Sequence, residues 1–392
     1  MKLAACLWMA AAAALAWDNN WNTHVQRANE LAESGKFAEA EKAYQQAMEA
    51  AQSADDRAAA VAQVQNNLGA LYHRMARYPE AEAMYVLSLP VYEQFHGLAR
   101  RSYAAVLSNL AEVKRATGRF AEAEPLYRKA IAIRAEVAAD DPGLGAPMNN
   151  LAVLLNSKGE PREAEEWARK AIESWRKVNA PVRLAAAYNT LGESLRLQRR
   201  LEESARCHMQ AIEIRKQTLA PDHPEIATGI SNLGSVFYEQ GNYEESERLY
   251  REALAIREKS LGADHPSIAY LWNNIGTSLQ ARRRPVEAEN CYRKAMGMLE
   301  AAGLAGHPDY AKSVSNLAVI FIGQGKFRGA ETLYLRALEV RKKALGEGSA
   351  ALAEDYQWLA ELYQLQKRFT EAERYSRRAA GQRAPAGVST FR

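Results

Sequence analysis

The amino-acid sequence predicts an all-α protein, a solenoid of about nine helix-turn-helix repeats. Two observations predict it: a short phrase recurs about every 42 residues, and small residues recur at three fixed positions within each interval. Self-similarity at a period of roughly 20–50 residues is typical of solenoids, in which each unit buries its apolar face only against its neighbours. We expect the solenoid to extend over residues 17–380.

The recurring phrase is a Leu or Ile followed by Gly or Ala. Its apolar residue is separated by 40 to 42 residues from the next, at Leu68, Leu110, Leu151, Leu191, Leu233, Ile275, Leu317 and Leu359. Ala28 marks a further, degenerate copy. The nine copies lie near residues 21–50, 62–96, 104–138, 145–178, 185–219, 224–261, 266–301, 308–345 and 351–380.

Three positions in each copy are small without exception, as Gly276, Ala288 and Ala295 are in the seventh. A turn with a Gly in five copies falls between the first two positions, so each copy reads as helix, tight turn, helix. Tyr292 lies four residues after Ala288, and five other copies have the same Tyr. This spacing places the Tyr and the small residues on one face of the second helix.

Prolines and the ends of the chain set the expected boundaries. His-Pro pairs at His223, His265 and His307 place a Pro in the first turn of a helix, where its missing N–H costs nothing. Pro125 and Pro285 fit at or near the start of second helices, and Pro90 is expected to kink or end its helix. Residues 381–392 have no periodic apolar positions and are expected to be disordered.

The pattern of small, aromatic and turn residues resembles the tetratricopeptide repeat. The interval of 42 residues, the phrase Asn-Leu-Gly or Asn-Leu-Ala, and the linker from Leu261 to Pro266 resemble its kinesin light chain type over about Trp21 to Ala379. The resemblance implies a right-handed superhelix that holds an extended protein or peptide in its concave groove. It does not imply cargo transport by a motor, because no heptad region precedes the repeats.

Composition and motifs argue against other classes of function. The 51 basic and 47 acidic residues leave a net charge of only +4, too little to attract nucleic acid. No nucleophile elbow, P-loop or dinucleotide fingerprint is present, so we expect neither an enzyme nor a cofactor. Equivalent histidines of successive repeats lie about 8–10 Å apart or more, so no metal site is expected.

The N-terminus has the pattern of a cleavable signal peptide over residues 1–16. Lys2 precedes an apolar stretch from Leu3 to Leu15, and Ala14-Leu15-Ala16 is a small-x-small cleavage site. The stretch is shorter than the roughly 20 residues that span a bilayer. We therefore expect a bacterial protein that is secreted or periplasmic, with no membrane span.

An asparagine row is the polar feature that most suggests a binding site. Asn is a mediocre helix former, yet it precedes the recurring apolar residue at Asn67, Asn109, Asn150, Asn232, Asn274 and Asn316. Stacked first helices would align these amides along the concave wall, where they could bond a peptide backbone; the alternative is that each bonds the neighbouring repeat. Thr190 interrupts the row. Specificity is expected from nearby residues on the same face, including Asn149, Asn189, Asn273, Arg115, Arg196, Tyr238, Tyr270 and Lys312.

The sequence thus predicts a scaffold that binds a protein or peptide partner. The alternative is a structural solenoid that associates with itself in an envelope complex, and the sequence does not set the oligomeric state. Arg282-Arg283-Arg284 could bind phosphate, but they fall on a turn between two helices, so solvated charge is the favoured interpretation.

Overall fold

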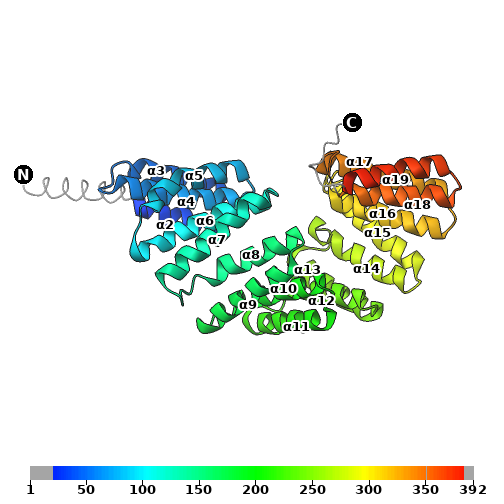
Figure 1. Cartoon of the computed structure of the whole chain (residues 1–392), viewed down its shortest axis with the longest axis horizontal. Helices are drawn as coiled ribbons and strands as arrows, with labels where there is room; N and C mark the ends of the chain where they lie inside the picture. The colour runs from blue at the N-terminus through cyan, green and yellow to red at the C-terminus, as the bar shows by residue number, and fades with distance from the viewer. Residues whose placement is uncertain (1–20, 350, 384–392) are drawn as a thin grey trace, which may run out of the picture. The chain divides into compact units, whose positions relative to one another are not determined.

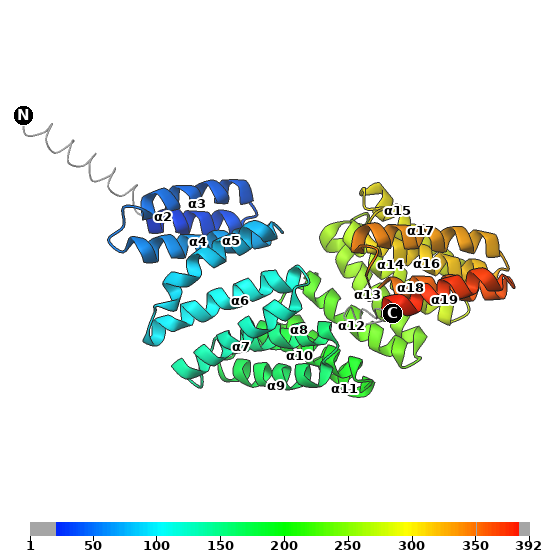
Figure 2. The same ribbon diagram turned by 45° about the horizontal axis from the view of Figure 1, so that its top comes forward.

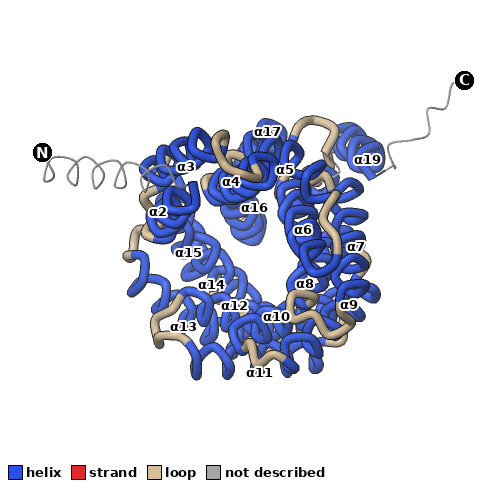
Figure 3. Tube along the Cα trace, turned by 90° about the vertical axis from the view of Figure 1, so that its left-hand side faces the viewer, coloured by secondary structure: helices blue, strands red, loops and turns tan. Residues whose placement is uncertain are grey.

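A computed structural model describes residues 21–349 and 351–383, and within these ranges the regular structure is entirely helical. Figure 3 shows the helices joined by loops and turns, with no strand in the part of the chain described. The expectation of an all-α chain of tandem helix-turn-helix repeats is confirmed. The segment predicted to be a signal peptide, residues 1–16, lies outside the described residues.

The chain divides into two compact units, residues 1–199 and 200–392; Figure 1 labels their helices. The division falls in the turn between the two helices of the fifth repeat. The first unit contains α2 (Trp21–Glu33), α3 (Phe37–Ala51), α4 (Arg57–Arg74), α5 (Tyr78–Glu93), the 3₁₀ turn η1 (Gly97–Ala99), α6 (Arg100–Ala116), α7 (Phe120–Val137), α8 (Gly145–Lys158), α9 (Pro161–Lys177) and α10 (Pro181–Leu197).

The second unit begins with the second helix of the fifth repeat. It contains α11 (Leu201–Thr218), α12 (Pro224–Glu239), α13 (Tyr243–Leu261), the 3₁₀ turn η2 (Pro266–Ile268), α14 (Ala269–Ala281), α15 (Pro285–Ala301), α16 (Pro308–Gly323), α17 (Phe327–Leu345), α18 (Leu352–Leu365) and α19 (Phe369–Arg383). In each unit a helix packs on its hairpin partner and on the next repeat, as α2 to α5 do in Figure 2.

The small position of the first helix exists because the second-helix Tyr packs directly on it. A Cβ built on Gly276 would lie 2.6 Å from Cε1 of Tyr292, and one on Gly69 would lie 2.8 Å from Cε1 of Tyr85. These Tyr side chains are fully buried. Helix backbone and aromatic ring therefore meet without space for a further carbon, and this contact sets the spacing of the two helices.

Each turn between the two helices of a repeat has one residue in the left-handed backbone conformation. Glycine occupies it in the copies where the sequence predicts a turn, for example Gly241 at φ 81°. The other four repeats place a larger residue there, at Ala76, Arg199, Arg283 and Lys367, with φ between 57° and 63°. Because an L-residue in this region is strained by roughly 1 kcal/mol, packing of the two helices must hold these turns in place.

The His-Pro pairs begin first helices, as the sequence indicates, and the histidine contributes a bond of its own. Nδ1 of His223 accepts from the backbone N–H of Glu225 at 3.2 Å, and His265 and His307 accept equivalently from Ser267 and Asp309 at 3.2 Å. Each histidine thus caps the helix that its Pro begins.

Two expectations about helix boundaries need correction. Pro125 lies in the second turn of α7 and not at its start, so one backbone hydrogen bond of that helix is lost. Helix α19 continues through Gly381 to Arg383, beyond the point where disorder was expected. Pro90 lies inside α5, which ends at Glu93.

Candidate functional site

The asparagine row lies on the first helices, with three members in each unit. All six side chains are half-buried. Asn109 donates to Oδ1 of Asn66 in the preceding repeat at 3.3 Å, and Nδ2 of Asn316 is buried without a partner. The side-chain amides of Asn67, Asn150, Asn232 and Asn274 make no hydrogen bond within residues 21–349 and 351–383. The row is therefore reachable from solvent and for the most part not used in bracing the fold.

The second set of asparagines, one residue earlier, behaves differently. Asn273 is fully buried, and its Nδ2 donates to Oγ of Ser313 in the next repeat at 2.7 Å. The prediction that Asn273 contacts a ligand is wrong, because its side chain joins repeats seven and eight and is buried from solvent. Asn149 and Asn189 are half-buried, and Oδ1 of Asn149 is buried with no partner among the residues described.

The two arginines expected on this face are held by glutamates on their own helices. Arg115 donates from Nε to Glu112 at 3.0 Å, and Glu112 also accepts from the hydroxyl of Tyr127 at 2.7 Å. Burial acts to raise the pKa of Glu112, but the bonds from Arg115 and Tyr127 outweigh it and hold the pKa below its usual range. Arg196 is fixed on Glu193 at 2.7 Å. Both arginines are oriented by their glutamate partners.

Tyr238, Tyr270 and Lys312 belong to three successive first helices of the second unit. Tyr238 packs against Tyr243 with ring centroids 5.2 Å apart, and the guanidinium of Arg257 lies 5.7 Å from the centroid of Tyr270. Lys312 is exposed. The structure therefore places these residues on accessible parts of α12, α14 and α16.

One member of the row lies in a pocket of about 180 Å³ in the first two repeats. The pocket was not evident from the sequence, because four of its lining residues belong to the degenerate first repeat. The pocket is lined by Asn29, Ala32, Glu33, Tyr44, Asn67, Ala70, Leu71 and Arg74. It combines an apolar floor with amide, hydroxyl and charged groups, as small binding sites commonly do.

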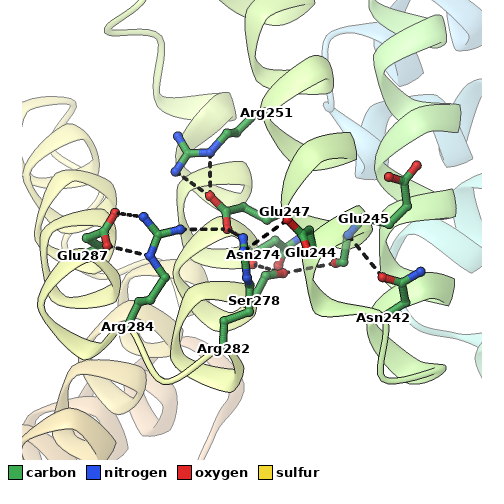
Figure 4. Close-up of polar contacts among 11 residues, drawn as sticks. Asn242, Glu244, Glu245, Glu247, Arg251, Asn274, Ser278, Arg282, Arg284 and Glu287 are labelled. Atoms are coloured by element: carbon green, nitrogen blue, oxygen red, sulfur yellow. Dashed lines mark hydrogen bonds and ion pairs between the residues drawn. The ribbon is translucent and has the colours of Figure 1, made fainter.

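The arginines at the turn of the seventh repeat are not simply solvated, which corrects the sequence interpretation. Arg282 places Nη1 at 2.5 Å from Glu247 of the preceding repeat, and Arg251 approaches the same carboxylate at 2.8 Å (Figure 4). Arg284 lies 3.7 Å from it and pairs with Glu287 at 2.6 Å. Arg283 is the left-handed turn residue. Arg282 and Arg284 are therefore paired with carboxylates, and the contact of Arg282 with Glu247 joins two repeats.

The contact between Glu247 and Arg282 recurs along both units. The glutamate after the middle small residue of one repeat bonds a polar side chain at or near the turn of the next repeat. The pairs are Glu41 with Arg77, Glu82 with Arg119, Glu124 with Lys158, Glu165 with Gln198, Glu289 with Gln324 and Glu331 with Arg368. We call these contacts the inter-repeat bridges. The sequence contains a signal for these bridges, because the glutamate follows the middle small residue in most repeats.

Replacing Glu247 with glutamine is expected to lower the free energy of unfolding by about 1–2 kcal/mol at pH 7, because three arginines lose their carboxylate. Burial acts to raise the pKa of Glu247, but bonds from Arg251 and Arg282 hold it below its ordinary value of 4.5. A carboxylate whose pKa is lower in the folded than in the unfolded state stabilises the folded state at pH values above the unfolded pKa. This stabilisation is lost as the pH falls through the folded pKa. In an acid denaturation series the difference from wild type should therefore shrink as the pH falls below 4.5 and vanish once the pH lies below the folded pKa; a difference that does not shrink would contradict the assignment.

Two further features are absent from the part of the chain that the structure describes. Residues 21–349 and 351–383 contain no group of three or more His, Cys, Asp or Glu side chains placed to hold a metal ion. No helix in the same ranges is both long enough and apolar enough to cross a membrane.

The sequence matches the family model of the tetratricopeptide repeat over residues 22–94, 102–177, 183–259, 225–301 and 309–381. No curated protein is significantly similar in sequence. Among solved structures, the chain is similar to the apo form of the quorum sensor NprR from B. thuringiensis, with 15% identity, a TM-score of 0.68, and coverage of 93% of this chain and 98% of that one.

Two more solved structures are similar to this chain. One is a Rap protein complexed with Competence and Sporulation Factor, with 14% identity, a TM-score of 0.62, and coverage of 93% and 98%. The other is BtubC (BKLC) from P. vanneervenii, with 22% identity, a TM-score of 0.49, and coverage of 56% of this chain and 90% of that one. At these identities the likeness concerns the fold alone. The match to the family model covers most of the chain, which therefore belongs to the tetratricopeptide repeat family, with repeats of the 42-residue, kinesin-light-chain-like type.

Proposed function

We propose that this protein is a non-catalytic scaffold that binds an extended peptide segment of a partner along the first-helix face. Tetratricopeptide repeats are protein-interaction modules, and the finer assignment rests on one observation. Five of the six side-chain amides in the asparagine row, all but that of Asn109, have no hydrogen-bond partner within the described residues, although the row keeps one phase across repeats. An amide offers two donors and an acceptor, which matches the backbone of a peptide of any sequence.

The neighbouring contacts support this proposal. Bracing between repeats is carried out elsewhere, by the inter-repeat bridges and by buried pairs such as Asn273 with Ser313. Apart from Asn109, which bonds Asn66, the asparagine row makes no such contact within the described residues. Of the similar structures, the Rap protein is complexed with Competence and Sporulation Factor, and NprR is a quorum sensor. Solved structures of this architecture thus include one in complex with such a factor.

The double substitution Asn232→Ala with Asn274→Ala tests the proposal. The probe is a twelve-residue peptide selected from a random display library on the protein that starts at Trp17. The double variant is expected to bind it about 1–3 kcal/mol more weakly, because two amide contacts are lost. Its melting temperature should hardly change, since neither amide makes a hydrogen bond in the described structure and Ala is the better helix former.

Asn273→Ala is the matched control, one residue away on the same helix. It removes the bond to Ser313 and is expected to lower the free energy of unfolding by about 1 kcal/mol while leaving peptide affinity unchanged. If the double variant were destabilised and kept wild-type affinity, the row would be a brace between repeats and the proposal would fail.

We further propose that the protein is exported after cleavage behind Ala16, as the pattern of residues 1–16 predicts. The intact mass of the protein purified from its native host tests this. A product that retains Lys2 would contradict it.

A further inference from the structure

The eighth repeat departs from a contact that its two predecessors share. In repeats six and seven the second-helix Tyr bonds a hydroxyl of the first helix: Tyr250 with Ser235 at 2.8 Å and Tyr292 with Thr277 at 3.4 Å. Val319 occupies this position in repeat eight and is 40% exposed. The hydroxyl of Tyr334 therefore makes no hydrogen bond in the part of the chain that the structure describes.

The ninth repeat places an indole beside this Tyr. Trp358 has the phase of the asparagine row on α18, and its ring stacks on Tyr334 with centroids 5.9 Å apart and an angle of 21°. Trp358 is half-buried, and its indole N–H has no hydrogen-bond partner among residues 21–349 and 351–383. The indole N–H of the half-buried Trp358 and the hydroxyl of Tyr334, a residue that is only 4% exposed, are thus unused at the end of the row.

A carboxylate completes the group. Glu361 follows Trp358 by three residues, so the two side chains are neighbours on the helix surface. It is exposed and accepts from Nε2 of Gln357 at 3.0 Å. Burial first, and then the charges of Glu361 and Asp355, raise the pKa of Tyr334 to about 12. Glu361 therefore lies on the same side of α18 as Trp358, the residue that stacks on Tyr334.

The basic groups nearby do not neutralise Glu361. Arg341 lies 5.6 Å from the centroid of the Trp358 ring, but its guanidinium is paired with the buried carboxylate of Asp355. Lys312 is seven residues before Val319 on α16, which separates them by about 10 Å along the helix. The negative charge of Glu361 is thus available to a ligand.

We propose that Val319, Tyr334, Trp358 and Glu361 form a subsite for an arginine side chain of the bound peptide. This inference rests on the proposed function and names one preference of the same face. The methylene stem of arginine packs on Val319 and the indole, and its planar guanidinium donates to the Glu361 carboxylate and to the hydroxyl oxygen of Tyr334. Arginine suits the site better than lysine because its guanidinium stacks on rings and binds with several donors.

N-acetyl-arginine amide is the probe, because it tests the subsite without the rest of a peptide. We expect a saturable shift of the Trp358 indole N–H signal in NMR, assigned by its loss in Trp358→Phe. Glu361→Gln is expected to weaken binding about three- to tenfold, and Val319→Ser, which restores the partner found in repeat six, should also weaken it. Glu373→Gln on α19 is the matched charge control and should bind as wild type does.

Two outcomes would overturn the subsite: no shift with N-acetyl-arginine amide, or an equal affinity for N-acetyl-norleucine amide. The variant with Asn232→Ala and Asn274→Ala should bind the arginine probe as wild type does, because those residues lie on α12 and α14. Loss of the arginine response in a protein that still binds the selected peptide refutes only the subsite. If the asparagine row proves to be a brace but the protein still responds to N-acetyl-arginine amide, only the contact between the row and the peptide backbone is refuted.

Discussion

Replacing Arg341 with methionine is expected to lower the free energy of unfolding by about 3–5 kcal/mol at pH 7, because it leaves a buried carboxylate without its counter-charge. Asp355 is 2% exposed, and Arg341 donates to its Oδ1. Oδ2 is buried and has no partner in the described residues. Chemical denaturation followed by circular dichroism measures the effect.

The pH dependence of this variant gives an internal check. Burial outweighs Arg341 and raises the pKa of Asp355 to about 6 from an ordinary 3.8. A folded pKa above the unfolded one means that the native state holds the proton more tightly, so stability falls as the pH rises through that window. Removing Arg341 raises the folded pKa further. The deficit of the variant should therefore be smaller at pH 5.5 than at pH 7.

A double variant separates lost charge pairing from lost packing. Arg341→Met with Asp355→Leu replaces the ion pair with apolar side chains and should recover most of the stability. If the double variant were as unstable as Arg341→Met alone, the loss would come from the contact of the Arg341 guanidinium with the Trp358 ring, and the ion-pair explanation would be wrong.

Replacing Tyr292 with alanine is expected to lower the free energy of unfolding by about 3–5 kcal/mol, because a fully buried ring leaves a cavity between α14 and α15. The ring lies against Gly276, and its hydroxyl donates to Oε1 of Gln280 at 2.9 Å. Urea denaturation of wild type and variant measures the loss. A change below about 1 kcal/mol would mean that the repeats close around the missing ring.

Gly276→Ala tests the same contact from the other helix. Its Cβ would lie 2.6 Å from Tyr292, so overpacking should cost about 1–3 kcal/mol although alanine is the better helix former. Gly297→Ala is the matched control, since a Cβ on Gly297 in α15 meets nothing within 4 Å. It should stabilise by about 0.5–1 kcal/mol. Destabilisation by both would show that the close approach to Tyr292 is not the cause.

The sequence by itself determined the helices, their pairing into repeats and the position of the close helix contacts. These features depend on neighbours along the chain, and repetition presents each signal several times, as the small residues and the second-helix Tyr show. The asparagine row was also visible in the sequence, and its six side chains are half-buried in the structure. Turns without glycine, such as that at Arg283, were less visible because packing imposes their conformation against local preference.

Only the tertiary structure decided which polar side chains stay open to solvent and which are used between repeats. Adjacent residues Asn273 and Asn274 look alike in the sequence, yet one is buried on Ser313 and the other is half-exposed. Arg282 similarly has the sequence of a solvated turn residue but bonds Glu247, which is 35 residues away. The physical reason is that a rotation of about 100° per residue separates neighbouring side chains on a helix, and stacking of the next repeat then covers one direction and leaves the other open.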